Sequence, residues 1–120
     1  ADVSFISLAL VLPALRGLMA IEGLDVDDCQ AIVLVKPQFE VGRQRVGKGG
    51  VVRDPAAHVD AITAVSEAAL PLGWNPTGLV ASPLTGPAGN HEYLLWLSSR
   101  LNPEFNGSVI EAVVSATLNE

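Results

Sequence analysis

The chain has 120 residues and a mass of 12.5 kDa, which is enough for one domain. Hydrophobic residues make up 49% of it and charged residues only 17%, a composition that argues against intrinsic disorder. Its net charge of −6 argues against an isolated nucleic-acid-binding domain, for which a basic patch is expected. The single cysteine, Cys29, excludes an internal disulfide framework.

The longest apolar stretch, residues 5–15, does not predict a membrane span. Arg16 ends it before the ~18–20 apolar residues that a spanning helix needs. A signal peptide needs a positively charged beginning, and the first charge here is Asp2. The stretch is therefore expected to form a helix from Ser7 to about Ile21 inside a cytoplasmic α/β protein.

The next part of the chain alternates between strand and helix patterns. The unbroken β-branched run at residues 31–36 is typical of a strand buried on both faces of a parallel sheet. Residues 37–53 contain too many glycines for regular structure. Asp54 and Pro55 are typical of a helix start, and Gly73 is expected to end that helix.

Two more strands and a helix are expected in the remaining chain. Residues 74–82 and 92–98 have strand patterns and are joined by a loop at 82–90, so they should pair antiparallel at an edge. After a break at residues 102–103, residues 109–118 should form a short amphipathic helix. The element order predicts an α/β fold with a mostly parallel sheet and an antiparallel edge strand.

Three ionisable side chains are expected to meet at one edge of this sheet. Asp2 ends the first element, Lys36 ends the buried strand, and Glu92 opens the final strand, which runs in the opposite direction. Open α/β sheets bind ligands at the carboxyl ends of their strands, where these residues would lie. For Lys36 alone, the simpler interpretation is an amine that extends into water. An amine between two carboxylates, however, is typical of an enzyme site.

Most of the cations gather in one glycine-rich segment, where only Glu40 opposes them. They are Lys36, Arg43, Arg45, Lys48 and Arg53. Such a segment could form a phosphate-facing site on an otherwise acidic protein, or it could be a solvated loop without a partner.

Other motifs give weaker signals. Residues 42–48 match the GxxxxGK spacing of a phosphate-binding loop, but Gly49 stands where a serine or threonine would bind magnesium. His58 falls in a predicted helix, and His91 is expected to line a pocket or face water, so no metal-ligand spacing is present. Cys29 has no cationic neighbour in the sequence that would activate its thiol.

Four segments together resemble the TlyA family, hemolysin-like members of the FtsJ-type RNA 2′-O-methyltransferases. They are DVSFISL at residues 2–8, LVKPQFEVG at 34–42, GKGGVVRDP at 47–55 and SPLTGPAGNHEYLLWL at 82–97. The resemblance implies that the chain is the C-terminal half of a Rossmann-like methyltransferase domain. Residues 1–98 would form this partial domain, without its cofactor-binding half, and residues 99–120 would form a tail with a short helix.

The resemblance also implies an activity. The family's catalytic set is lysine, aspartate, lysine and glutamate; its first lysine would lie upstream, and the other three match Asp2, Lys36 and Glu92. The full-length protein would use S-adenosylmethionine to methylate a ribose 2′-hydroxyl of ribosomal RNA. Lys36 would be the base, and the two carboxylates would position the amine and the substrate. The 120-residue chain alone is expected to bind no cofactor and to be inactive.

The same resemblance gives the cationic segment a partner. Arg43, Arg45, Lys48 and Arg53 would bind rRNA phosphates near the target nucleotide on ribosomal subunits. One alternative is a hemolysin-type membrane-active protein, for which the sequence offers no basic amphipathic helix. Another is a non-catalytic interaction module. We also expect a homodimer, because an incomplete sheet exposes a strand edge and apolar surface.

Overall fold

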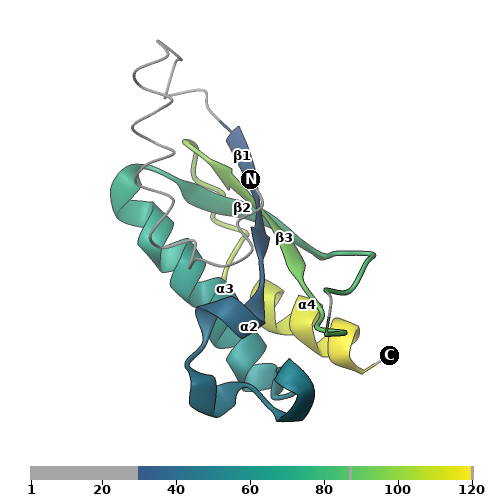
Figure 1. Ribbon diagram of the computed structural model, residues 1–120. Helices are drawn as coiled ribbons and strands as arrows, with labels where there is room; N and C mark the ends of the chain where they lie inside the picture. Colours follow the sequence, from purple (N-terminus) through teal and green to yellow (C-terminus); the bar gives the residue numbers. More distant parts are fainter. Residues whose placement is uncertain (1–29, 87, 120) are drawn as a thin grey trace.

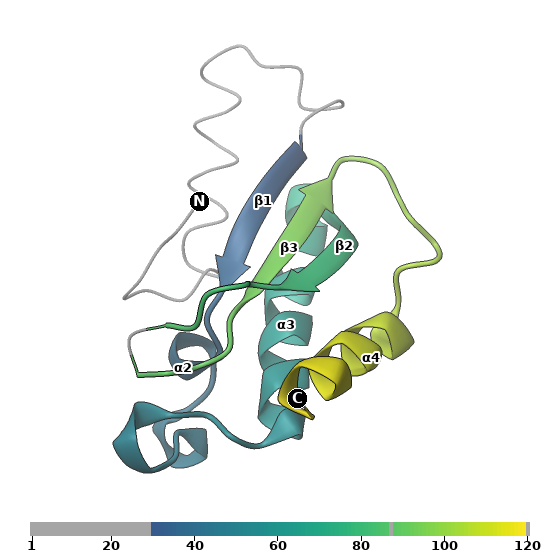
Figure 2. The ribbon, with the colours of Figure 1, turned by 90° about the vertical axis from the view of Figure 1, so that its right-hand side faces the viewer.

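The computed structural model of the chain describes residues 30–86 and 88–119. The expectations for Asp2, Cys29 and a helix at residues 7–21 lie outside this part of the chain. Within it, a three-stranded sheet packs against two helices, α3 (Pro55–Ala69) and α4 (Gly107–Leu118) (Figure 1, Figure 2). The α/β class expected from the sequence is confirmed.

The sheet has the strand order β1–β3–β2. These strands are Gln30–Val35 (β1), Asn75–Ala81 (β2) and Tyr93–Ser98 (β3). β3 pairs antiparallel with both neighbours, so β1 and β2 run in the same direction without touching. The expected mostly parallel sheet with an antiparallel edge strand is therefore not seen in the described residues, where β3 is central. The crossover through α3 leaves a gap one strand wide between β1 and β2, and β3 fills it.

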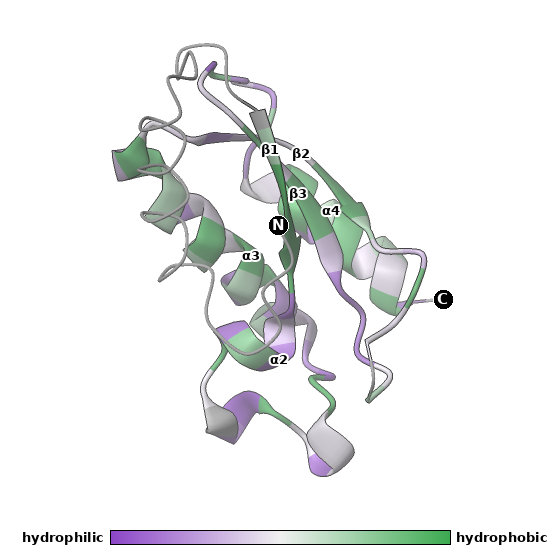
Figure 3. Ribbon diagram, turned by 45° about the horizontal axis from the view of Figure 1, so that its top comes forward, coloured by the Kyte–Doolittle hydropathy of each residue, from purple (hydrophilic) through white to green (hydrophobic). Residues whose placement is uncertain are grey.

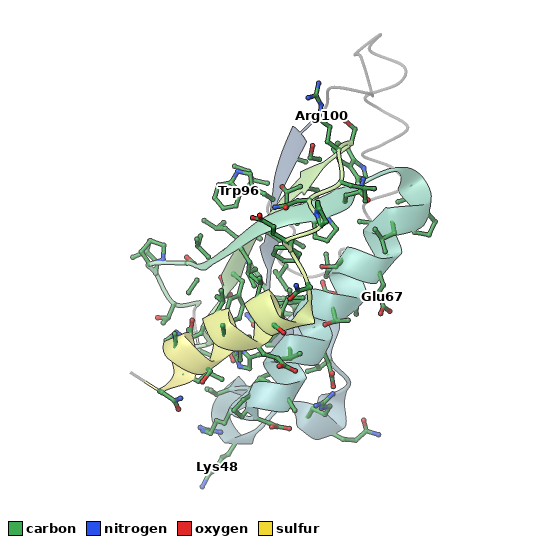
Figure 4. The ribbon with its side chains drawn as sticks, turned by 180° about the vertical axis from the view of Figure 1, so that it is seen from behind. Lys48, Glu67, Trp96 and Arg100 are labelled. Carbon is green, nitrogen blue, oxygen red and sulfur yellow. The ribbon has the colours of Figure 1, made fainter. Side chains whose placement is uncertain are left out.

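One face of the sheet forms the core and the other stays partly accessible. Val33 and Val35 are fully buried beneath α3, whereas Ile32 is 44% exposed and Val80 is 46% exposed. Figure 4 shows the Trp96 side chain on the side of the sheet away from α3. The prediction of a first strand buried on both faces is therefore wrong, because its alternate side chains point to different environments.

Helix α3 begins where the sequence predicts but ends at Ala69, four residues before Gly73. The Asp54 carboxylate accepts a hydrogen bond from the backbone N–H of Ala56 at 3.1 Å, and Pro55 occupies the first turn. A 3-10 turn, η3 (Leu70–Leu72), follows the helix. Gly73 ends it with a φ of 86°, a conformation that favours glycine.

Helix α4 joins the same core. The Asn106 side chain caps it by accepting hydrogen bonds from the backbone N–H groups of Ser108 and Val109. Ile110 and Val114 are buried in the cluster that includes the sheet and α3. The segment expected to form a C-terminal tail thus contributes apolar side chains to the packing of the sheet.

The glycine-rich segment at residues 37–53 contains more regular structure than expected. It forms a short helix, α2 (Pro37–Glu40), and two 3-10 turns, η1 (Arg43–Arg45) and η2 (Lys48–Gly50). Figure 3 shows this segment beyond the end of the sheet, with more polar residues than the apolar strands have. Such short turns carry no hydrophobic periodicity, which is why the sequence did not reveal them.

Candidate functional site

The candidate site lies where the end of β1 meets the start of β3. Val35 pairs with Tyr93 in the antiparallel register, and Lys36 and Glu92 are the next residues outward on the two strands. Lys36 is 8% exposed and Glu92 is 5% exposed. An amine and a carboxylate far apart in sequence therefore lie at one sheet edge, where buried charges need polar partners. The catalytic roles of Lys36, Glu92 and Asp2 stay predictions.

Two residues that the sequence analysis did not single out surround the Glu92 carboxylate. Nε2 of Gln38, in α2, donates a hydrogen bond to Oε2 of Glu92 at 2.9 Å. Gly86, in the loop between β2 and β3, lies so close that a Cβ atom there would collide with Oε2. Oε1 of Gln38 is buried and has no hydrogen-bond partner among the described residues. Both residues fall within motifs quoted above, Gln38 in LVKPQFEVG and Gly86 in SPLTGPAGNHEYLLWL, and these motifs are the signal that could have found them.

A buried hydrogen-bond network fastens the glycine-rich segment beside this edge. In the fully buried His58, Nε2 lies 2.8 Å from the carbonyl oxygen of Val52, and Nδ1 lies 2.9 Å from the hydroxyl of Tyr93. Because a carbonyl only accepts, Nε2 carries the ring proton and Nδ1 accepts from Tyr93. Oδ1 of Asn90 accepts from the Val52 N–H at 2.8 Å, and its Nδ2 donates to the carbonyl of Gly50 at 2.8 Å.

Burial keeps this network uncharged. It lowers the pKa of His58, because a buried imidazolium loses its hydration. Burial likewise raises the pKa of Tyr93 to about 12. Both side chains are therefore neutral near pH 7, and the network acts as an anchor for Val52.

The cations predicted to bind RNA have different surroundings. They are Arg43, Arg45, Lys48 and Arg53, and the structure describes the side chains of the last three. The Arg45 guanidinium lies 2.5 Å from a carboxylate oxygen of Asp60 and 3.6 Å from one of Asp54. Nη2 of Arg53 donates to the backbone carbonyl of Lys48 at 3.1 Å. The Lys48 side chain extends away from the body of the protein (Figure 4).

A pocket of about 490 Å³ lies between the end of β2 and α4. Its lining includes Ser82, His91 and Thr117, so the first of the two alternatives expected for His91, a pocket rather than water, is the one observed. Lys36 and Glu92 do not line it. The pocket therefore adjoins the Lys36–Glu92 edge through Ser82 and His91 but does not contain the two edge residues.

The described part of the chain lacks a membrane-spanning helix, a metal cluster and a nucleotide phosphate loop. No helix in residues 30–86 and 88–119 is long and apolar enough to cross a membrane. Within the same residues, no three His, Cys, Asp or Glu side chains are grouped to hold a metal ion. Residues 42–48 lead into 3-10 turns, and α3 starts only at Pro55, so they lack the loop-to-helix junction of a nucleotide phosphate loop.

Comparisons with known proteins relate the chain to one family. Residues 1–99 match the model of the FtsJ-like methyltransferases. The 16S/23S rRNA (cytidine-2′-O)-methyltransferase TlyA of Mycobacterium tuberculosis is 46% identical over 120 residues, which are 100% of this chain and 42% of that protein. YqxC of Bacillus subtilis, provisionally described as an rRNA methyltransferase, is 51% identical over 96 residues, which are 80% of this chain and 32% of that protein.

Solved structures agree with this relationship. A protein from Streptococcus thermophilus, provisionally described as a hemolysin, superposes with a TM-score of 0.82 and is 39% identical. The match covers 98% of this chain and 41% of the other. The chain thus spans less than half the length of the curated relatives it matches.

Proposed function

The chain belongs to the FtsJ-like methyltransferase family, and we propose that it supplies the acceptor side of a site that methylates a ribose 2′-hydroxyl of ribosomal RNA. The observation that carries this proposal is the placement of the nearly buried Lys36 and Glu92 at one sheet edge. Relatives that are named for rRNA methylation support the substrate class. Because ribosomal RNA is cytoplasmic, the proposal places the protein there.

The chemistry needs a base and a fixed geometry. Bound S-adenosylmethionine supplies a methyl group on a sulfonium sulfur. Lys36 would take the proton of the 2′-hydroxyl as the ribose oxygen receives the methyl group. Glu92, held by Gln38, orients the amine and the ribose, and Asp2 joins them as the resemblance implies. We assign none of the described residues to the cofactor.

We assign RNA binding to the cationic segment. Arg43, Arg45, Lys48 and Arg53 would hold phosphates on either side of the target nucleotide. Their support is the exposure of Lys48 and Arg53 in a segment that Asn90 fastens to the loop leading into Glu92.

Replacing Lys36 tests the function most directly. In the full-length protein, we expect Lys36→Met to lower the single-turnover rate of methyl transfer to rRNA by about 10²–10⁴-fold, because it removes the general base. Labelled methyl transfer followed by nuclease digestion and mass spectrometry measures the rate and identifies the 2′-O-methyl nucleoside. Arg100→Met, which replaces an exposed cation outside the proposed site, is the control and should keep its rate. A Lys36→Met protein as fast as wild type would exclude the proposed mechanism.

We also propose that the 120-residue chain on its own binds no S-adenosylmethionine and forms a homodimer. Ile32 and Val80, on the accessible sheet face, would lie in the dimer interface. Calorimetric titration should detect S-adenosylmethionine binding by the full-length protein only. Light scattering at micromolar concentration should give a dimer for the chain and a monomer for Ile32→Lys. A monomeric wild-type chain would refute the dimer.

A further inference from the structure

Asn90 links the cationic segment to the loop that leads into Glu92. It is 1% exposed, and both ends of its carboxamide have a partner. Oδ1 accepts a hydrogen bond from the backbone N–H of Val52 at 2.8 Å, and Nδ2 donates to the backbone carbonyl of Gly50 at 2.8 Å. Because an N–H only donates and a carbonyl only accepts, these partners fix the orientation of the amide. A residue of the loop between β2 and β3 thus holds the backbone of residues 50–52.

The backbone of Asn90 is in turn connected to the surroundings of the Glu92 carboxylate. The N–H of Gly86 donates to the carbonyl of Asn90 at 2.8 Å, and Gly86 is the residue that lies against Oε2 of Glu92. Two residues after Asn90, the carbonyl of Glu92 accepts from the N–H of Ser82 at 2.8 Å, which closes the loop at the end of β2. A displacement of Asn90 would therefore move Gly86 and, through it, the Glu92 carboxylate.

The side chains assigned to RNA phosphates lie next to this link. Lys48 and Arg53 are exposed, and they flank the short stretch at residues 50–52 that Asn90 holds. The distance between Glu92 and a phosphate bound by either cation would therefore depend on Asn90. Methyl transfer is sensitive to such distances, because a displacement of about 1 Å far from the chemistry can lower a rate about a hundredfold.

We propose that Asn90 is a positioning residue for the methyl transfer, which keeps the cationic segment and the Glu92 carboxylate at a fixed distance from each other. This inference rests on the proposed function. Asn90 acts through the backbone of residues 50–52 on one side and through Gly86 on the other. RNA phosphates held by the segment are then aligned with the Lys36–Glu92 edge, where the ribose reacts.

A split between rate and affinity tests this role. Asn90→Ala removes both side-chain contacts and leaves the cations of the segment in place. In the full-length protein, we expect it to lower the single-turnover rate of methyl transfer at saturating rRNA by about 10–100-fold. The Kd for rRNA should change by less than about threefold and its salt dependence should stay the same, because the phosphate contacts persist. A variant that was merely unfolded would lose rate and affinity together.

Two more variants separate positioning from stability. Asn102→Ala is the matched control, because the Asn102 side chain also has two contacts: it donates to the carbonyl of Thr77 at 3.1 Å and accepts from the N–H of Glu104 at 3.1 Å. Urea denaturation should show that both alanine variants lose stability, whereas Asn102→Ala should keep the wild-type rate. Asn90→Gln retains both ends of the amide on a side chain one CH₂ longer, and it should recover part of the rate lost in Asn90→Ala.

The outcomes are distinct from those of the proposed function. If wild type transfers methyl groups to rRNA and Asn90→Ala keeps the wild-type rate at saturation, the inference is overturned. A loss confined to Kd and the salt dependence also overturns it, because Asn90 would then serve RNA binding alone. If Asn90→Ala does not fold, Asn90→Gln replaces it: a lower rate at unchanged Kd supports the inference, and a wild-type rate overturns it. A wild-type protein that transfers no methyl group to rRNA refutes the proposed function and the inference with it.

Discussion

The Lys36–Glu92 edge and the cationic segment at residues 42–53 adjoin each other but are held in different ways. The first is fixed by the backbone register of β1 and β3. The second is fixed at Val52 by the side chains of His58 and Asn90. The edge therefore cannot shift without breaking the sheet, whereas the segment depends on side-chain contacts from α3 and from the loop before β3. This division suits reacting groups that must stay in place and cations that must follow an RNA backbone.

The largest effect on the methyl-transfer rate should come from adding a side chain next to Glu92 at the Lys36–Glu92 edge. A methyl group at Gly86 would collide with the Glu92 carboxylate, so Gly86→Ala should displace Glu92 and lower the methyl-transfer rate of the full-length protein about a hundredfold. Gly107→Ala is the control, because a Cβ atom there meets open space. Wild-type rates in Gly86→Ala would mean that the position of Glu92 is not critical.

Removing His58, which anchors Val52, should first lower the stability of the fold and only then affect the methyl-transfer rate. His58→Phe leaves both the carbonyl of Val52 and the hydroxyl of Tyr93 without their partner, which should lower the free energy of unfolding by about 2–4 kcal/mol. Urea denaturation measures the loss. His91→Phe, in the open pocket beside α4, should change it by less than about 1 kcal/mol. Equal losses would show that Val52 has other support.

The same variant gives the pH dependence of the anchor. Because the pKa of His58 is lower in the folded protein, the unfolded chain takes up a proton first as the pH falls. The contribution of His58 to stability is therefore complete above about pH 6.5 and decreases below it. Wild type should lose more stability than His58→Phe between pH 7.5 and 5.5. Parallel losses would assign the acid sensitivity to other groups.

The smallest effects should come from single cations of the segment. Lys48→Ala should reduce the slope of log Kd for rRNA against log salt by about 0.7–0.9, as expected for one lost phosphate contact. Arg45→Ala should change it less, because Arg45 must first leave Asp60. Asp60→Asn should strengthen binding about twofold by releasing that arginine. An unchanged slope after replacing Arg43, Arg45, Lys48 and Arg53 together would remove the segment from the RNA contact surface.

Local signals in the sequence predicted the elements and the antiparallel pairing of β2 with β3, but not the order of the strands in the sheet. Asp54 and Gly73 marked the ends of the helical stretch because capping and left-handed backbone depend on single residues. The central position of β3 escaped prediction, because a pattern of apolar residues does not specify strand neighbours. Gln38 escaped for a similar reason, since its partner Glu92 is 54 residues away and only the fold brings the two together.

The central place of β3 also determines when the sheet can form. β1 and β2 do not pair with each other. Among the described strands, each of them therefore has no neighbour until β3 folds back between them. Among the strands of residues 30–86 and 88–119, β1 therefore gains its partner only after some sixty further residues have been synthesised, and exposed apolar strands are prone to aggregation. The order of the strands along the chain therefore delays completion of this sheet until β3 has been synthesised.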